Sequence, residues 1–213
     1  MSNDDGQSVA FYFDPGCPWT WITSRWLTEV AAARDLEVTW RTFSLSRSNE
    51  WAGNVIPEMY RGRIAAQFRG LRVLEAARAA YGEVAVAALY TEFGARIHHD
   101  DDGDLTGLAD AIAAVGLAGT LIDAADDESW DSVIDDSTRA GQALVGRDVG
   151  VPIIVIGGGT DRVTFSGPIM SPAPGGDAAL RLWDLYVGLG EFDGLFEIKR
   201  SRNVGPMFGP RPT

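Results

Sequence analysis

Cysteine is almost absent from this sequence, and its scarcity limits what the protein can be. The 213 residues hold one cysteine, Cys17, so no disulfide can form within the chain. Structural disulfides are typical of oxidising compartments, and nothing here indicates one. Residues 1–6 are acidic and have no apolar run, which excludes an ordinary secretory signal. No apolar run approaches the ~18 residues of a membrane span. We therefore expect a cytoplasmic protein.

Positive charge is also scarce. The chain has 30 Asp and Glu against 18 Lys and Arg, which gives a formal net charge of -12, and Lys199 is its one lysine. A field of this sign repels nucleic acid and anionic membranes, so we expect neither as a partner. Histidine is limited to His98 and His99. Two neighbouring imidazoles supply too few ligands for a metal site, and we predict no metal.

A strand, a turn and a helix surround the one cysteine. Residues 8–13 alternate and are rich in Val, Phe and Tyr, as a buried strand would be. The Asp-Pro-Gly turn at 14–16 ends the strand, and Pro18 suits the first turn of a helix over 18–33. Free N–H groups and the positive end of the helix dipole then favour the thiolate. The pattern predicts that Cys17 is a nucleophile and not only a packing residue.

The remaining chain reads as a second strand, a helical part and a return to β structure. A strand at 36–43 would complete a parallel strand-helix-strand unit, the opening half of a thioredoxin fold. Residues 44–148 are helical in pattern. Apolar residues at helical steps predict helices in this part over 57–81, 86–97, 105–115 and 128–145. A hairpin of 151–156 and 163–165 around the turn 157–162 follows, and then a closing helix from Gly176.

Two loops imitate binding motifs without their full pattern. The acidic loop 100–104 has its glycine at the wrong position for an EF-hand and no glutamate at the twelfth position, so we expect a solvated helix cap. The triple glycine 157–159 lies between two strands, and no helix follows it. It therefore reads as a hairpin turn and not as a phosphate loop.

The motif Cys-Pro-Trp-Thr at 17–20 resembles the Cys-x-x-Cys motif of the thioredoxin superfamily, with threonine in place of the second cysteine. The wider segment 13–26, Phe-Asp-Pro-x-Cys-Pro-Trp-x-Trp-Ile-Thr-Ser-Arg-Trp, resembles the actinobacterial mycothiol-dependent nitroreductase and reductase group of the DsbA family. The resemblance continues in segments at 57–61, 96–98, 149–152, 165–168 and 196–200. It implies an α/β protein with a thioredoxin-like fold and an inserted α-helical domain.

The resemblance also implies boundaries and site residues. The thioredoxin-like parts would be 1–46 and 149–213, and the inserted helical domain 47–148. Cys17 and Thr20 would be catalytic. Candidates for contact with the thiol or substrate lie beside Cys17, in the resembling segments or at the expected cis-proline; they are Pro18, Trp19, Trp21, Asn49, Tyr60, His98, Val151 and Pro152. A cis peptide at Val151–Pro152 would lie against the cysteine and leave backbone groups free for an extended thiol.

Three functions fit a site with one thiol. In the first, Cys17 attacks a disulfide or helps to reduce a small electrophile such as a nitro compound. Mycothiol or another low-molecular-weight thiol then acts as co-substrate and resolver, because no second cysteine can do so. Thr20 would either donate a hydrogen bond to the thiolate or only fill the space of a sulfur.

The second function is that of a transferase or isomerase. It would resemble the kappa-class glutathione transferases and hydroxychromene carboxylate isomerases, which activate the thiol of a bound cofactor. The third is a binding protein that lost its chemistry, against which the presence of Cys17 and Pro152 argues. In the enzymatic readings the partners are a small thiol and a disulfide or electrophilic substrate, and the resemblance suggests a homodimer.

Overall fold

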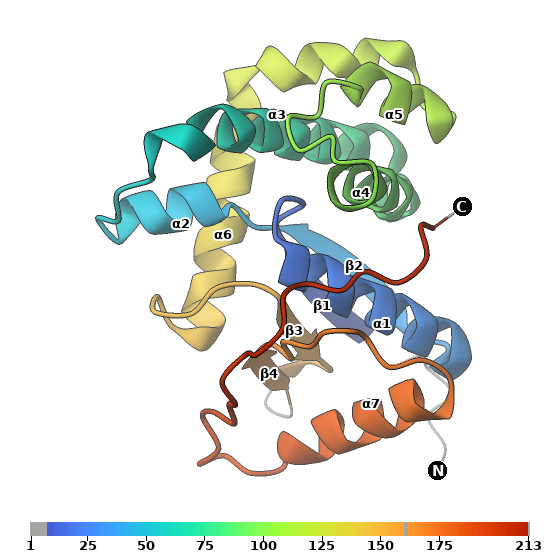
Figure 1. The fold of residues 1–213 in the computed structure, drawn as a ribbon, viewed down its shortest axis with the longest axis vertical. Helices are drawn as coiled ribbons and strands as arrows, with labels where there is room; N and C mark the ends of the chain where they lie inside the picture. The colour runs from blue at the N-terminus through green and yellow to red at the C-terminus, as the bar shows by residue number, and fades with distance from the viewer. Residues whose placement is uncertain (1–7, 160–161, 213) are drawn as a thin grey trace.

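The computed structural model describes residues 8–159 and 162–212. Its centre is a four-stranded sheet with the order β2-β1-β3-β4 (Figure 1). The strands are β1 (Ser8–Phe13), β2 (Glu37–Thr42), β3 (Ile153–Ile156) and β4 (Val163–Ser166). Strand β1 pairs in parallel with β2 and antiparallel with β3, and β3 pairs antiparallel with β4. The predicted parallel unit and the hairpin are confirmed. The expectations for residues 1–6 and 160–161 lie outside the described residues.

The helices lie on more than one side of the sheet: in Figure 1 most of those between β2 and β3 lie above it, and the C-terminal helix lies below it. Helix α1 (Pro18–Arg34) connects β1 with β2, and α7 (Asp177–Leu189) follows β4. Between β2 and β3 lie α2 (Leu45–Trp51), α3 (Glu58–Tyr81), α4 (Glu83–His98), α5 (Leu108–Ala114), two short 3-10 helices (Gly119–Asp126 and Glu128–Trp130) and α6 (Asp131–Val145). This arrangement is the DsbA-like thioredoxin fold with an inserted helical domain (Figure 1). In the described part, no helix is long and apolar enough to cross a membrane.

Glycines end two helices where the sequence predicts, but three helix starts differ by three residues. Helix α4 begins at Glu83 and not at 86, and the other two are α5 and α6. Gly82 and Gly146, with φ of 80° and 105°, stand directly after α3 and α6. Helix α5 begins at Leu108 and not at 105, because the Asp102 carboxylate accepts the N–H groups of Thr106 and Gly107 and holds an open loop there. The acidic segment 100–104 thus orders the loop before α5 and does not form the expected helix cap, because the N-cap residue is Gly107, which has no side chain to cap the helix. The helix expected over 128–145 is a 3-10 turn followed by α6.

Helix α1 buries more of its circumference than one apolar stripe would. The residues spaced at helical steps along one side, Trp19, Ile22, Trp26 and Val30, are buried except Trp19, which is half-buried. Trp21 is also buried, because α4 covers this side of α1, where the Trp21 ring meets Tyr90 edge-on at 5.8 Å. On another side the ring of Trp26 lies 5.9 Å from that of Trp183 in α7.

A buried ionic group joins the helical insertion to the sheet. Glu75 of α3 is 4% exposed, and its carboxylate accepts the hydroxyl of Thr42 in β2 at 2.6 Å. Arg78, one turn later, pairs with Glu75 at 3.0 Å and also contacts Glu83 and the carbonyl oxygen of Trp40. Because charges and polar groups are costly to bury unless they are paired, this group fixes the position of α3 on the edge strand β2.

Candidate active site

Cys17 is the cap residue of α1, directly after the turn that ends β1. Its backbone is extended, with φ of -84° and ψ of 112°, and Pro18 is the first helical residue. The Cys17 N–H donates to the carbonyl oxygen of Asp14 at 3.0 Å. The predicted turn and helix start are confirmed, and they place the sulfur at the positive end of α1.

The Asp14 carboxylate accepts hydrogen bonds within this turn and from the helical insertion. One carboxylate oxygen accepts the N–H of Gly16 at 2.9 Å and the other accepts the N–H of Leu45, the first residue of α2, at 2.8 Å. The side chain is 7% exposed. Burial raises the pKa of Asp14 to about 6, although both hydrogen bonds act to lower it. Sequence reasoning treated Asp14 only as a turn former. The bond to Gly16 is a local signal, but the bond to Leu45 depends on the fold.

His98 supports the same turn from α4. Its Nε2 lies 2.9 Å from the carbonyl oxygen of Pro15, and because a carbonyl only accepts, the imidazole donates. The ring stacks on Trp21 with a centroid distance of 5.8 Å. Burial lowers the pKa of His98 to about 4, so the ring is neutral at pH 7. This geometry makes His98 a support of the Cys17 turn.

The two tryptophans near Cys17 have different surroundings. Trp21 is 1% exposed, donates its indole N–H to Nε2 of His99 at 3.2 Å and carries the Arg25 guanidinium 4.1 Å above its ring. It therefore belongs to the core. Trp19 is half-buried, packs against the apolar cluster that contains Cys17 and has the Arg202 guanidinium 4.9 Å above its ring. Of the two, Trp19 is the one that keeps part of its surface exposed beside the Cys17 cluster.

The Cys17 side chain is 8% exposed and lies in a small apolar cluster with Phe43, Val151 and Leu45. Burial raises the pKa of the thiol, and the charge of Asp14 adds to this rise. The thiolate expected from the helix start is therefore wrong for the isolated protein. The N–H groups of Thr20 and Trp19 act in the expected direction, but burial outweighs them.

Thr20, the residue in place of a second cysteine, is fully buried one helical turn from Cys17. Its hydroxyl finds no oxygen or nitrogen partner among residues 8–159 and 162–212. Its position beside the Cys17 sulfur acts to lower the pKa of that thiol.

The peptide bond between Val151 and Pro152 is cis, as the resemblance implies. Both residues are buried, and Val151 is in the same cluster as Cys17. The Pro152 carbonyl oxygen accepts the N–H of Gly167 at 2.8 Å. Two further cis peptides, Gly167–Pro168 and Ser171–Pro172, follow in the next loop.

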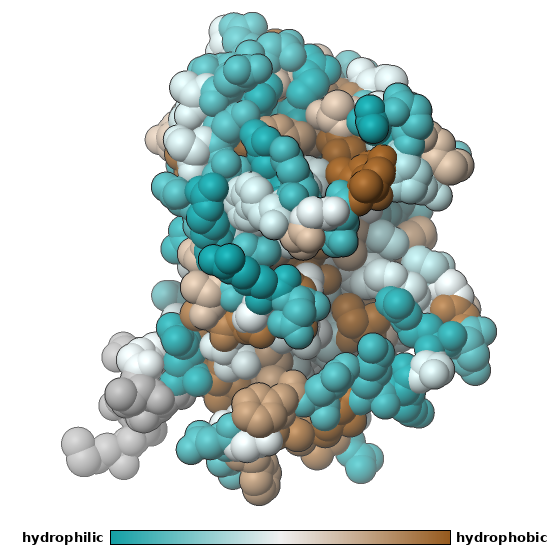
Figure 2. Space-filling view, turned by 90° about the vertical axis from the view of Figure 1, so that its left-hand side faces the viewer, coloured by the Kyte–Doolittle hydropathy of each residue, from teal (hydrophilic) through white to brown (hydrophobic). Residues whose placement is uncertain are grey.

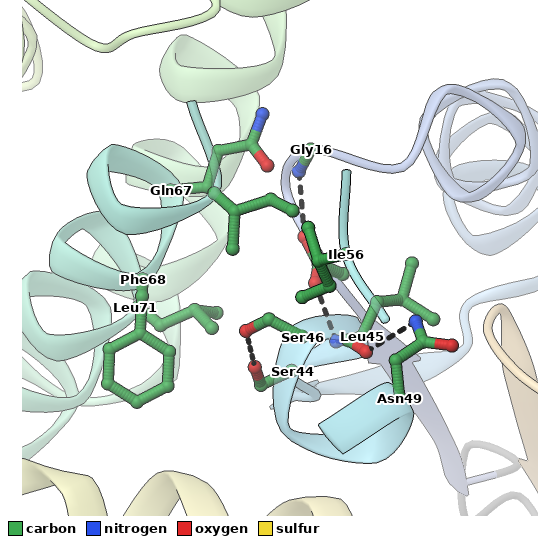
Figure 3. Close-up of a pocket in the computed structure, with 11 residues that line it drawn as sticks. Gly16, Ser44, Leu45, Ser46, Asn49, Ile56, Gln67, Phe68 and Leu71 are labelled. Carbon is green, nitrogen blue, oxygen red and sulfur yellow. Dashed lines mark hydrogen bonds between the residues drawn. The ribbon is translucent and has the colours of Figure 1, made fainter. Parts of the chain in front are cut away.

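A pocket of about 170 Å³ lies beside the Cys17 turn (Figure 3). The turn itself, α2, α3 and Ile56 form its walls. Asn49 lines this pocket and donates its amide N–H to the Leu45 carbonyl oxygen at 2.8 Å. Tyr60 is 49% exposed at the start of α3 and is not a lining residue.

The fold therefore brings together Cys17, Thr20, Val151 and Pro152, with Pro18 and Trp19 adjacent. Asn49 lies in the neighbouring pocket, His98 behind the turn, Trp21 in the core and Tyr60 on the surface. The functional roles of these residues stay predictions. Within the described ranges, His, Cys, Asp and Glu side chains form no group of three or more that could hold a metal ion.

Comparison with known proteins gives a family for this chain. The family model described as "Rv2466c-like: Mycothiol-dependent nitroreductase Rv2466c" matches residues 16–200. A Mycobacterium tuberculosis relative, "Uncharacterized protein Rv2286c", is 30% identical over 207 residues, which cover 92% of this chain and 83% of the relative.

Solved structures share the fold at lower identity. The probable DsbA oxidoreductase SCO1869 from Streptomyces coelicolor has a TM-score of 0.56 and 19% identity, with 94% of this chain and 97% of that chain covered. A 2-hydroxychromene-2-carboxylate isomerase has a TM-score of 0.59 and 18% identity, with 86% and 95% covered. At these identities the similarity describes the architecture alone.

Proposed function

The chain belongs to the family of the mycothiol-dependent nitroreductase Rv2466c, and we propose that it is a monothiol thiol-disulfide oxidoreductase with a small thiol of the mycothiol type as co-substrate. The observation that carries this proposal is the single thiol at the start of α1, beside the cis peptide Val151–Pro152 and with a buried threonine in place of a second cysteine. Small electrophiles such as nitro compounds are further candidate substrates, on the strength of the family.

Two small thiols supply the electrons and protons of the proposed reaction. The Cys17 sulfur, as thiolate, attacks one sulfur of a disulfide, forms a mixed disulfide and releases the other half as a thiolate, which takes up a proton. Thr20 cannot attack this bond. A small thiol therefore cleaves it and takes the bound half, while Cys17 leaves as thiolate. With a second small thiol in the next exchange, two thiols are oxidised to one disulfide, and the substrate disulfide gains two electrons and two protons.

The protonation of the Cys17 thiol limits its reactivity in the free enzyme. Because burial keeps Cys17 largely protonated at neutral pH, the free enzyme resists oxidation and alkylation. The rate of attack rises with pH into and above the ordinary thiol range, since the thiolate is the nucleophile and the pKa of this thiol is raised. Asp14, with its raised pKa, is the buried carboxylate nearest in sequence to the thiol and can exchange protons around neutral pH.

A second candidate function is the activation of a bound thiol cofactor, as in a transferase or isomerase. Two observations favour it. Burial protonates Cys17, and the buried Thr20 hydroxyl has no oxygen or nitrogen partner among the described residues, so it is free to donate to an incoming thiolate. In this case Cys17 would shape the site without forming a covalent bond.

We place the protein in the cytoplasm of an actinobacterium, because one free thiol suits a reducing compartment and the family uses mycothiol. The homodimer that the resemblance suggests stays a prediction.

The variant Cys17→Ser separates the two candidates. We expect it to retain the melting temperature of the wild type within a few degrees and to lose turnover of a small disulfide with a small thiol to the uncatalysed rate. Turnover that survives in the folded variant would contradict the oxidoreductase and support the transferase or isomerase.

A further inference from the structure

A second pocket of about 170 Å³ lies between α2 and the C-terminal half of α6. Its volume is several times the ~30 Å³ that one water molecule takes up in the liquid. Cys17 does not line it, and neither does any residue predicted above to contact the thiol or substrate. The lining comes from α2 and its end, from α6 and from the loop after α6; it consists of Ser48, Trp51, Ala52, Arg139, Gln142 and Arg147.

The charge of this α2–α6 pocket is opposite to that of the chain. Two of its lining residues are arginines and none is an acid, in a protein with a net charge of -12. The Gln142 carboxamide donates to the Ser48 hydroxyl at 2.9 Å and holds α6 against α2 at this point. The two guanidinium groups therefore set the charge of the pocket.

Arg139 has only distant acidic partners. Its guanidinium lies 3.6 Å from the Asp136 carboxylate and 3.9 Å from that of Asp135, both longer than the roughly 2.7–2.9 Å of a charge-assisted hydrogen bond. The same guanidinium lies 4.4 Å from the ring centre of Trp51, and this cation–π contact keeps it beside the pocket. Its N–H groups thus remain available for a closer anion.

Arg147 follows the end of α6 and is exposed. It forms no ion pair with an acid among residues 8–159 and 162–212. The next residue, Asp148, turns its carboxylate back towards Gly146, where an added Cβ would fall 2.8 Å from the Asp148 oxygen. The pocket therefore has two arginines, neither of which is neutralised at close range by its own chain.

We propose that the α2–α6 pocket binds a small dianion of the phosphate or phosphate-monoester type through the guanidinium groups of Arg139 and Arg147. A phosphate monoester carries a charge of about -2 near neutral pH, which matches two guanidinium groups, and its oxygens suit their planar N–H pairs. A monocarboxylate would leave one cation without a partner. Trp51 and Ala52 add apolar surface for the organic part of an ester. Such a site goes beyond the proposed function and involves no step at Cys17.

A ligand in this pocket would also stabilise the fold. Its walls belong to α2 and α6, which meet again at the apolar cluster that contains Cys17, because Leu45, Leu144 and Val145 pack against that cluster. A ligand that binds only the folded protein raises its melting temperature. Binding can therefore be measured both directly and through unfolding.

Equilibrium dialysis of the full chain with radiolabelled inorganic phosphate, at constant ionic strength, is the direct test. We expect one saturable site with a Kd of about 1 mM, as two charge-assisted contacts at a solvent-accessible pocket provide. Benzoate, a monoanion, should compete at least about tenfold more weakly. Phenyl phosphate distinguishes the two sources of the dianion: competition at lower concentration than unlabelled phosphate assigns the site to esters, and otherwise to the inorganic ion.

Three variants test the arginines. Arg139→Gln and Arg147→Gln should each weaken phosphate binding about tenfold, because one charge-assisted contact is lost. Arg181→Gln is the matched control, since it removes the same charge from an exposed position of α7, and it should bind like the wild type. About 10 mM phosphate should raise the melting temperature of the wild type and of the control by about 3 °C. The two pocket variants should show less than half of this rise.

The conservative variant Arg147→Lys keeps the test decisive if a glutamine variant does not fold. It retains the charge but not the planar fork, and we expect it to weaken binding about threefold. Absence of saturable binding to the wild type below about 20 mM phosphate, or equal Kd values in the pocket variants and in Arg181→Gln, would overturn the site. Benzoate that competes as well as phosphate would overturn the assignment to a dianion.

Discussion

At the scale of single residues, opposed effects meet at Cys17. The local effects, N–H groups at the helix start and the Thr20 hydroxyl, lower the pKa of the thiol and are visible in the motif at 17–20. Burial, which raises it, comes from Phe43 and Val151, far away in the chain. The sequence could therefore predict the position of the nucleophile but not the net direction of its pKa.

Thr20→Val tests whether the threonine hydroxyl serves the sulfur or only fills space. Because the hydroxyl has no oxygen or nitrogen partner in the described structure, we expect a free energy of unfolding within about 1 kcal/mol of the wild type. We expect alkylation of Cys17 at pH 8 to slow by about fivefold, because a donor to the thiolate is lost. The control Thr23→Val removes a bond to the Pro168 carbonyl oxygen and should destabilise without a change in alkylation. An unchanged rate in Thr20→Val would assign the residue to packing.

Asp14 and His98 both form hydrogen bonds with the Cys17 turn. Their contributions to the free energy of unfolding depend on pH in opposite directions. The raised pKa of Asp14 means that the native state keeps a proton between pH 4 and 6 that the unfolded state releases, so its contribution to stability is lost as pH rises through 6. The lowered pKa of His98 means that the unfolded state binds a proton below pH 6.5 that the native state refuses until about 4. Its contribution is lost as pH falls. Each amounts to about 3 kcal/mol.

Variants of the pair should separate these contributions. Between pH 6.5 and 4.5 we expect the unfolding free energy of the wild type to change little. Asp14→Asn should lose about 2 kcal/mol over this range, because His98 acts alone, and His98→Gln should gain about 2 kcal/mol while it keeps a donor for Pro15. Urea unfolding at each pH measures this, and equal slopes in the two variants would contradict the assigned protonation states.

At the scale of elements, the connection between α3 and β2 depends on Glu75. Glu75→Ala leaves the Thr42 hydroxyl and the partly buried Arg78 with fewer partners, and we expect a loss of about 3 kcal/mol in the free energy of unfolding. Glu50→Ala is the control, because its pair with Arg47 is exposed and should contribute under about 0.5 kcal/mol. Similar small losses in both variants would show that apolar contacts alone position the insertion.

The element pattern itself was largely open to prediction, for physical reasons. Residues 8–13 and 18–33 have clear periods and turn chemistry at their ends, and Gly82 and Gly146 mark helix ends by their backbone freedom. The start of α5 was not open to prediction, because it depends on bonds from the Asp102 side chain to the loop. Nor was the burial of Trp21, since the cover that α4 provides is a tertiary contact. In the site, Gln67 and Ser46 line the pocket beside the Cys17 turn, and no pattern in the sequence indicated this.

At the scale of the whole molecule, the segment after α7 crosses from the sheet to the helical insertion (Figure 1). In the second half of this segment, the Ser171 hydroxyl donates to the Gly205 carbonyl oxygen and accepts the N–H of Met207, both at 2.8 Å. Further on, Phe208 packs on the imidazoles of His98 and His99 with centroid distances of 5.2 and 5.5 Å, and Arg211 pairs with Asp100 at 2.8 Å. The face on the α2 side is, by contrast, mostly hydrophilic with small separate apolar patches (Figure 2).

Phe208→Ala should release this tail. The lost contact with the two imidazoles is expected to lower stability by about 1 kcal/mol. Limited proteolysis should then cut after Arg202 at least severalfold faster. Phe196→Ala is the control, because that ring is 89% exposed and should change neither quantity. Equal proteolysis of both variants and the wild type would show that the tail is held by other contacts.

The most direct measurement of the central claim follows the mass of the intact protein through one exchange cycle. We expect a small disulfide to add one thiol half to the wild type, faster as pH rises, and free small thiol to remove it and restore the original mass. The Cys17→Ser variant should show neither change. A wild type that gains no mass while its folded thiol stays reduced, or an adduct that free thiol does not release, would contradict monothiol exchange at Cys17.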